Sequence, residues 1–241
     1  MNTLVNRFAR NIVGRDFAVG DIHGKFSRLA AALDEIGFDE DVDRLFSVGD
    51  LVDRGPESHC ALDWIGKTWF HAVRGNHEDM AIRWPDGEMG KGTYVGNGGG
   101  WNVANTPDVQ RRISDAFKTL PIAIEVATLD GPIGIVHADC PLPDWTDFVS
   151  ALLDSDMPGP TRASIADAAI WSRKRVQSHD RSGVSKVRAV IVGHTPLACA
   201  TVLGNVYHID TASRLRDGCF TFINLATLEM IPATEQILPC R

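Results

Sequence analysis

Short apolar runs alternate with stretches of helical periodicity in the first third of the chain. Residues 17–19 form an apolar run that is typical of a buried strand, and apolar residues then recur at helical spacing from Phe26 to Ile36. Residues 45–48 and 69–73 predict two more strands, with a second helical stretch between them. Strands that alternate with helices in this order favour βαβ units and a parallel sheet.

The rest of the chain has a less regular pattern. Residues 122–126 and 133–137 predict a hairpin, and residues 189–192 predict a further strand. Three short apolar runs between positions 201 and 225 predict a closing β meander. The segment 86–100 contains seven glycines, and we expect it to be a mobile loop.

The length and composition favour one globular domain. The chain has 241 residues, of which 44% are hydrophobic and 23% are charged, close to the average for globular proteins. A chain of this length can bury a sizeable core without disulfides or structural metals. We expect residues 1–15 to be a leader and residues 16–241 to form a single α/β catalytic domain with layered sheets.

The charge balance limits the kinds of partner. The net charge is −7 and the sequence pI is about 5.6, whereas nucleic-acid-binding proteins favour a basic surface. We therefore expect no nucleic-acid partner. An acidic balance does not exclude a phosphorylated substrate, because bound metal ions invert the local field of a site.

The cysteines and the lengths of the apolar runs indicate the cellular location of the protein. The five cysteines are odd in number and form no CxxC pair, so we expect no disulfides and a reducing, cytoplasmic environment. No run of about 20 apolar residues predicts a membrane span, and no membrane partner is expected. The sequence does not indicate an oligomeric state.

Five segments, most of them at the ends of predicted strands, carry residue types that bind metal ions. They are GDIHG at 20–24, GDLVDRG at 49–55, GNHE at 75–78, VHAD at 136–139 and GHTP at 193–196. Ligands of α/β folds bind at the carboxyl ends of strands, where the loops converge. The mixture of Asp, Asn and His side chains suits Mn²⁺, Fe or Zn²⁺, whereas an all-oxygen Mg²⁺ or Ca²⁺ site would not need imidazoles.

These segments predict a centre with two metal ions. The predicted ligands are Asp21 and His23 for the first ion, Asn76, His137 and His194 for the second, and Asp50 as the bridge. Two ions a few ångströms apart need a bridging oxygen ligand, which a carboxylate supplies. A hydroxide between the ions would be acidified by both and would act as the nucleophile, so the reaction needs no nucleophilic Ser or Cys.

The neighbours of the predicted ligands suggest the remaining roles. His77 follows the ligand Asn76 directly and is expected to be the general acid for the leaving oxygen. Asp53 is expected to hold the His77 ring and to favour its protonated form. Arg54 offers a fork of donors to phosphate oxygens, and Asn76 is expected to lie at the phosphate as well.

The motifs resemble the GDxHG, GDxVDRG, GNHE, His and GH signature of the calcineurin-like metallophosphoesterases, and within them the phosphoprotein phosphatase family. The likeness is greatest to short prokaryotic and phage lambda-type serine/threonine protein phosphatases, and it extends from about residue 16 to residue 210, including NGGGW at 97–101. It implies a layered fold with a central β-sandwich flanked by helices. It also implies two divalent ions, often Mn²⁺. A segment similar to IWSR at 170–173 implies that Arg173 binds phosphate.

The chain departs from this family pattern at two positions. Cys140 stands where close relatives of the family carry an aromatic residue after HAD. Ala212 stands where Asp-Thr-Gly is usual after the late strand. Beside the predicted ligands, we expect Arg74 to form an ion pair with a carboxylate of the site, with phosphate binding as the alternative. We expect Asp139 to orient a metal-binding histidine rather than to be a ligand itself.

The resemblance favours a phosphomonoesterase that acts on phosphoserine and phosphothreonine, and sometimes phosphotyrosine, of proteins or peptides, or on a small phosphoester. The first alternative is a symmetrical dinucleoside tetraphosphatase, which shares GDIHG, GDLV and GNH. Asp53 and the GNHE motif argue against it, because relatives of that type usually differ at both places. A phosphodiesterase or nuclease, and a metal-bound scaffold without catalysis, are further alternatives.

Overall fold

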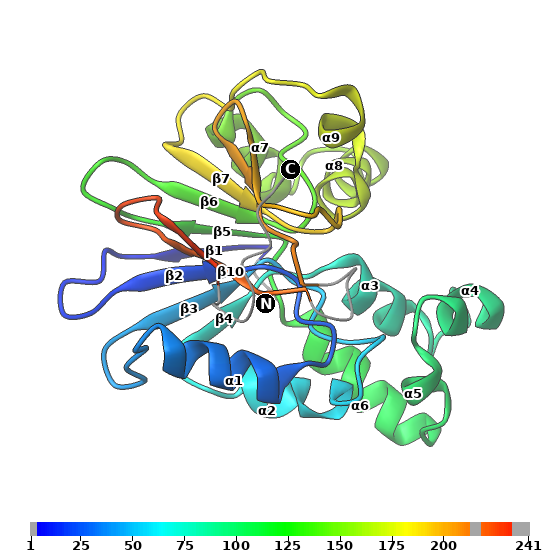
Figure 1. The fold of residues 1–241 in the computed structure, drawn as a ribbon. Helices are drawn as coiled ribbons and strands as arrows, with labels where there is room; N and C mark the ends of the chain where they lie inside the picture. Colours follow the sequence, from blue (N-terminus) through cyan, green and yellow to red (C-terminus); the bar gives the residue numbers. More distant parts are fainter. Residues whose placement is uncertain (1–3, 213–217, 233–241) are drawn as a thin grey trace.

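Two β-sheets form the centre of the computed structural model, which describes residues 4–212 and 218–232 (Figure 1). The six-stranded sheet has the order β1 (Val5–Phe8), β5 (Ala123–Val126), β6 (Ile133–Val136), β7 (Ala189–Val192), β9 (Val206–His208) and β8 (Thr201–Leu203). The five-stranded sheet has the order β11 (Met230–Pro232), β10 (Thr221–Asn224), β2 (Asp16–Val19), β3 (Arg44–Ser47) and β4 (Phe70–Ala72). This is the layered α/β sandwich that the sequence predicts.

Helices cover the outer face of each sheet (Figure 1). On the five-stranded sheet they are α1 (Phe26–Glu35), a short 3₁₀ helix (Ser58–Cys60), α2 (Ala61–Ile65), α3 (Asn76–Arg83) and α6 (Pro107–Lys118). On the six-stranded sheet they are α7 (Trp145–Leu153), α8 (Gly159–Trp171) and α9 (Lys174–Ser178). The short helices α4 (Lys91–Gly96) and α5 (Gly100–Val103) lie beyond the sheets, next to α3 and α6.

Three apolar layers hold these elements together, and strand geometry explains the layering. In β3, Leu45 packs against the helices, while the next residue, Phe46, packs between the two sheets. Successive side chains of a strand point to opposite faces, so a strand covered on both sides is apolar throughout. The third layer lies between the six-stranded sheet and α7 and α8, and it includes Trp145 and Phe148.

The strand directions explain where a site can form. β2, β3 and β4 run parallel, and β6 and β7 run parallel to each other. The carboxyl ends of parallel neighbours meet at one edge of a sheet, which places the loops after them side by side. The predicted hairpin of β5 and β6 is confirmed, with Ala123 paired to Val136.

Three expectations about the chain differ from the structure. Val5–Phe8, inside the expected leader, forms β1 and pairs with β5. The segment 86–100 contains α4 and the start of α5, so the prediction of a mobile loop is wrong. The predicted meander is only partly right, because β8 pairs with β9, whereas β10 crosses to the other sheet and pairs with β2.

The cysteine prediction is also corrected. Cys60, Cys140 and Cys219 are thiols, but Cys199 is disulfide-bonded. Neither an odd number of cysteines nor the lack of a CxxC pair excludes a disulfide. Whether two cysteines come within bonding distance depends on the fold. Within residues 4–212 and 218–232, no helix is long and apolar enough to cross a membrane.

Candidate metal centre

The loops that follow the strands hold their polar residues in a strained backbone. Several non-glycine residues of the predicted site have positive φ: His23 at 46°, Asp50 at 51°, Asp53 at 70°, Arg54 at 65° and His194 at 66°. Such conformations cost about 1–2 kcal/mol per residue and persist only where the surrounding structure enforces them. Their concentration in the predicted site marks these loops as a functional region.

Backbone hydrogen bonds join the loops to one another. The amides of Ile22 and His23 both donate to the Asp50 carbonyl oxygen, at 3.0 and 2.8 Å. The Gly193 amide donates to the His137 carbonyl oxygen at 2.8 Å. The loops after β2 and β3 are therefore fixed to each other, as are those after β6 and β7.

The first group of candidate ligands consists of His23, Asp50 and His77, whose ligand atoms all lie within 4.8 Å of one another. His23 Nε2 lies 3.6 Å from Asp50 Oδ2 and 3.7 Å from Asp21 Oδ2. The other ring nitrogen, Nδ1, faces the Val52 carbonyl oxygen at 3.0 Å, so it carries the proton and Nε2 is left as an acceptor that suits a cation. Burial lowers the pKa of His23 to about 3, which keeps the imidazole in the neutral form that metals require.

The second group consists of Asp50, His137 and His194. His137 Nε2 lies 3.3 Å from Asp50 Oδ1, 3.0 Å from Asn76 Oδ1 and 3.1 Å from His194 Nδ1. The Val48 carbonyl oxygen faces His137 Nδ1 at 2.8 Å and leaves Nε2 as an acceptor. Burial lowers the pKa of His137, and it lowers that of His194 to about 3. Acceptor atoms of four side chains thus converge, as a cation would require.

Asp50 belongs to both groups and faces each with a different oxygen. Its Oδ2 lies toward His23 and His77, and its Oδ1 lies toward His137. Burial alone would raise the pKa of Asp50, but the three neighbouring imidazoles hold it below its usual range. The carboxylate is therefore ionised and placed between the groups, as a bridging ligand has to be.

Two further buried carboxylates belong to this region: Asp21 lies beside Asp50, and Asp210 lies beside Asp21. Asp21 Oδ1 accepts a hydrogen bond from the His194 amide at 3.1 Å. Burial, followed by the charges of Asp210 and Asp50, raises the pKa of Asp21 well above its usual range. Carboxylates buried together need cations to balance them, so the donor set fits bound metal ions. Asp210 was not among the predicted residues, although it too follows a strand, β9.

His77 differs from the other histidines of the site in its electrostatics. Its Nδ1 lies 2.7 Å from Asp53 Oδ2, and Asp53 is fully buried. Burial alone would lower the pKa of His77, but the carboxylates of Asp50 and Asp53 raise it above its ordinary value. His77 therefore holds a proton more readily than His23 or His194, as a general acid must.

Two exposed arginines flank the ligand groups. The guanidinium of Arg54 lies over the first group, with one nitrogen 2.9 Å from His23 Nε2 and the other 3.1 Å from His77 Nε2. Arg173 precedes α9, and its Nε lies 3.2 Å from His194 Nε2. The structure thus brings both predicted phosphate-binding arginines to the centre, one at each group.

Glu78 has a position that sequence reasoning missed. Its buried carboxylate accepts hydrogen bonds from the amides of Gly75 and Asp50, both at 2.9 Å, and of Leu51 at 2.8 Å. Burial, and after it the charge of Asp50, raises the pKa of Glu78 to about 7. The sequence did contain a pattern that could have found this position, because a Glu three residues after a helix N-cap is typical of a capping box. Here the same side chain also holds the loop that carries Asp50.

Two expected contacts of the site are absent. Asp139 forms an ion pair with Arg175 at 2.8 Å, and backbone rather than Asp139 faces the ring of His137. Arg74 donates to the carbonyl oxygens of Lys118 and Leu120, at 3.0 and 3.2 Å, instead of pairing with a site carboxylate. Arg175 is buried on α9, and Arg74, which follows β4, is partly buried and reaches the chain at the end of α6.

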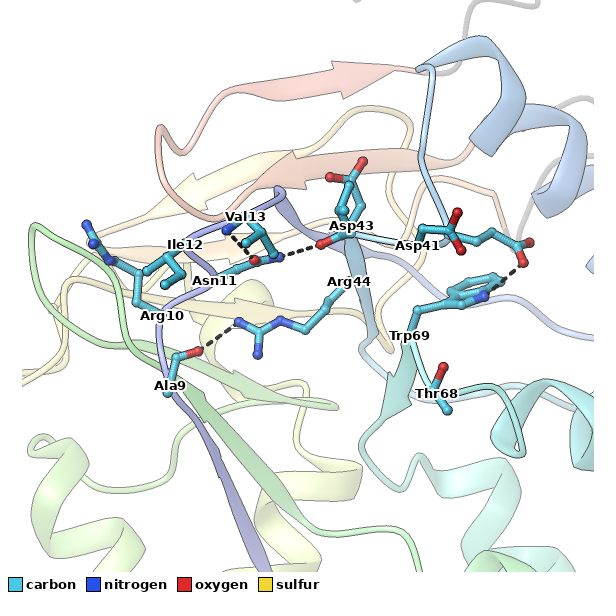
Figure 2. Close-up of a pocket in the computed structure, with 12 residues that line it drawn as sticks. Ala9, Arg10, Asn11, Ile12, Val13, Asp41, Asp43, Arg44, Thr68 and Trp69 are labelled. Atoms are coloured by element: carbon cyan, nitrogen blue, oxygen red, sulfur yellow. Dashed lines mark hydrogen bonds between the residues drawn. The ribbon is translucent and has the colours of Figure 1, made fainter.

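A cavity of about 350 Å³ lies away from this centre, before β3 and β4 rather than after them (Figure 2). Asn11, Arg44 and Trp69 are among its lining residues. Their polar groups are engaged locally: Asn11 Nδ2 donates to the Val42 carbonyl oxygen and an Arg44 nitrogen to that of Ala9, both at 2.8 Å. None of the predicted site residues lines it, so it is separate from the metal centre.

Comparison with known proteins agrees with this geometry. The calcineurin-like phosphoesterase family matches residues 17–198. Serine/threonine-protein phosphatase 1 of Salmonella typhimurium is 35% identical over 82% of this chain and 86% of its own. The symmetrical bis(5'-nucleosyl)-tetraphosphatase of Aromatoleum aromaticum is 28% identical over 79% of this chain and 69% of its own. A protein serine/threonine phosphatase from Saccharomyces cerevisiae shares the fold, with a TM-score of 0.65 at 15% identity over 99% of this chain and 86% of its own. The chain therefore belongs to the calcineurin-like phosphoesterase family of hydrolases.

Proposed function

We propose that this hydrolase is a metal-dependent phosphomonoesterase whose substrates are phosphoserine and phosphothreonine, and in some cases phosphotyrosine, of proteins or peptides. One observation carries the proposal: Asp50 lies between two groups of metal-binding side chains, directly beside the pair formed by His77 and Asp53. The relatives with 31–35% identity bear the names of serine/threonine-protein phosphatases, which supports the same substrate class.

The ligands would divide between two ions as the sequence predicts. Asp21 and His23 would hold one ion, Asn76, His137 and His194 the other, and Asp50 both. Mixed nitrogen and oxygen donors favour Mn²⁺, with Fe or Zn²⁺ as alternatives. When bound, the ions would supply a nucleophile acidified at neutral pH and would polarise the phosphoryl oxygens.

The protein's own side chains would perform the other steps. Arg54 and Arg173, with the amide of Asn76, would bind the phosphoryl oxygens and align the ester bond. His77 would donate its proton to the leaving oxygen, which becomes the hydroxyl of serine or threonine. Asp53 would hold the His77 ring by Nδ1, so that Nε2 faces the substrate.

A symmetrical dinucleoside tetraphosphatase is the second candidate, because proteins of that name share 24–28% identity with most of this chain. The test is a comparison of three substrates with one Mn²⁺-loaded preparation: a phosphoserine peptide, diadenosine tetraphosphate and bis-p-nitrophenyl phosphate. We expect kcat/KM for the peptide to exceed both others by about tenfold or more, since specificity is a ratio of these constants. Faster hydrolysis of the tetraphosphate would support the second candidate, and faster hydrolysis of the diester would indicate a phosphodiesterase.

The proposal extends to a cytoplasmic location, where phosphorylated proteins are available. The thiols of Cys60, Cys140 and Cys219 support it, whereas the disulfide at Cys199 opposes it, because disulfides persist mainly in oxidising compartments. Fractionation of cells that express the protein, followed by immunoblotting, tests this part of the proposal.

A further inference from the structure

The glycine-rich segment NGGGW, residues 97–101, packs against the loop that carries Asp53 and Arg54. Gly98 has a φ of +103°, and a Cβ at this position would collide with the backbone nitrogen of Arg54. A side chain at Gly99 would collide with the ring of Tyr94 in the same way. The glycines therefore serve close backbone approach rather than mobility.

Trp101 forms the second contact of this segment with the site. Its indole Nε1 donates to Asp53 Oδ1 at 2.7 Å, while Asp53 Oδ2 lies 2.7 Å from His77 Nδ1. The carboxylate thus has one oxygen for each partner. The Asp53 amide donates to Ser58 Oγ at 2.9 Å, so backbone and side chain are both fixed although φ is +70°.

Away from Asp53, the indole lies between the core layer and a small cavity. Trp101 lines a cavity of about 120 Å³ together with Leu62, Val109 and Phe117, which come from α2 and α6. Leu62 and Val109, like Trp101, pack against the core layer under the five-stranded sheet. The hydrogen bond to Asp53 therefore starts from a ring that packs partly against the core and borders this cavity.

We infer that Trp101 is a positioning residue for the reaction, acting through Asp53 on His77. The inference rests on the proposed function, because it concerns proton donation to the leaving group. Without the indole donor, the Asp53 carboxylate keeps only its contact with His77 Nδ1, so the orientation of the carboxylate is less fixed and the His77 ring loses part of the geometry that aims Nε2 at the substrate. Small errors in the placement of a reacting group reduce rates strongly.

The test uses Trp101→Phe, which keeps an aromatic ring and removes only the N–H donor and part of the ring system. We expect turnover of a phosphoserine peptide to fall by about 10–100-fold, a part of what general acid catalysis supplies. Turnover of p-nitrophenyl phosphate should change by less than about threefold, since its leaving group needs little protonation. Metal content should match that of the unaltered protein.

Trp69→Phe is a matched control, because the Trp69 indole also donates to a carboxylate, Glu40 Oε2 at 3.0 Å, but far from the centre. It should leave both turnover numbers within about twofold. Trp101→Phe in a His77→Asn background should have no further effect on the peptide, since coupled residues are not additive.

The outcomes separate this inference from the proposed function. If the unaltered protein hydrolyses neither substrate, both the proposed function and this inference are overturned. If the unaltered protein is active and Trp101→Phe has the same turnover numbers as Trp69→Phe, the inference alone is overturned. Equal losses on both substrates, or a further loss in the His77→Asn background, also overturn it, because the role of Trp101 would then be structural.

Discussion

Replacing Asp50 with asparagine is expected to remove at least one bound metal ion per chain and to lower turnover on the order of a hundredfold or more. The substitution keeps the shape of the side chain but removes the charge, and Asp50 is the residue whose two oxygens face both ligand groups. Metal analysis of the purified variant, together with turnover of p-nitrophenyl phosphate, measures both effects.

Asp43→Asn provides the control for Asp50→Asn. Asp43 is also a buried carboxylate, but it pairs with Arg15 at the opposite end of the strands. This variant should keep its metal content and its turnover, with at most a loss of stability. Two ions per chain and near-normal turnover in Asp50→Asn would contradict the bridging role.

The second large effect concerns His77. In His77→Asn we expect turnover of phosphoserine peptides to fall by about 10²–10⁴-fold, the range usual for general acid catalysis. A serine alkoxide is a poor leaving group without a proton, whereas p-nitrophenolate leaves easily, so the loss with p-nitrophenyl phosphate should be clearly smaller. Steady-state rates of one preparation with both substrates give the comparison.

Metal content decides whether His77 acts as an acid or as a ligand, a question that the geometry raises because His77 lies in the same group as His23 and Asp50. His77→Asn should keep two ions, whereas His137→Asn and His194→Asn should each lose one. An equal loss with both substrates, combined with a missing ion, would show that His77 is a ligand and that another group supplies the proton.

The sequence could group the candidate residues of the centre because they stand at strand ends. A glycine after a buried apolar run marks the end of a strand, and β2, β3 and β4 run parallel, so the residues after them meet at one edge. Local pattern alone was therefore enough to bring Asp21, Asp50 and Asn76 into one hypothesis. Arg173 came only from a short likeness, yet the structure places it beside His194.

Features that depend on distant packing were not predictable in this way. Trp101 and Asp53 are 48 residues apart, and only the packing of α5 and α6 brings the indole to the carboxylate. The same packing turned a glycine-rich segment, which looked mobile, into a fixed contact with Arg54. β1 was not predicted from the sequence because its residues do not form a continuous apolar run. It is an edge strand in which Val5 is buried while Arg7 faces solvent.

The most direct test of the two-metal centre is a titration of metal-free protein with Mn²⁺, in which bound ions per chain and turnover of a phosphoserine peptide are measured on the same samples. We predict no turnover without metal, and a rise to a plateau that is complete only when about two ions are bound per chain, because ligands of both groups meet at Asp50. Full turnover in protein shown to be free of metal, or a plateau at one bound ion, would contradict it.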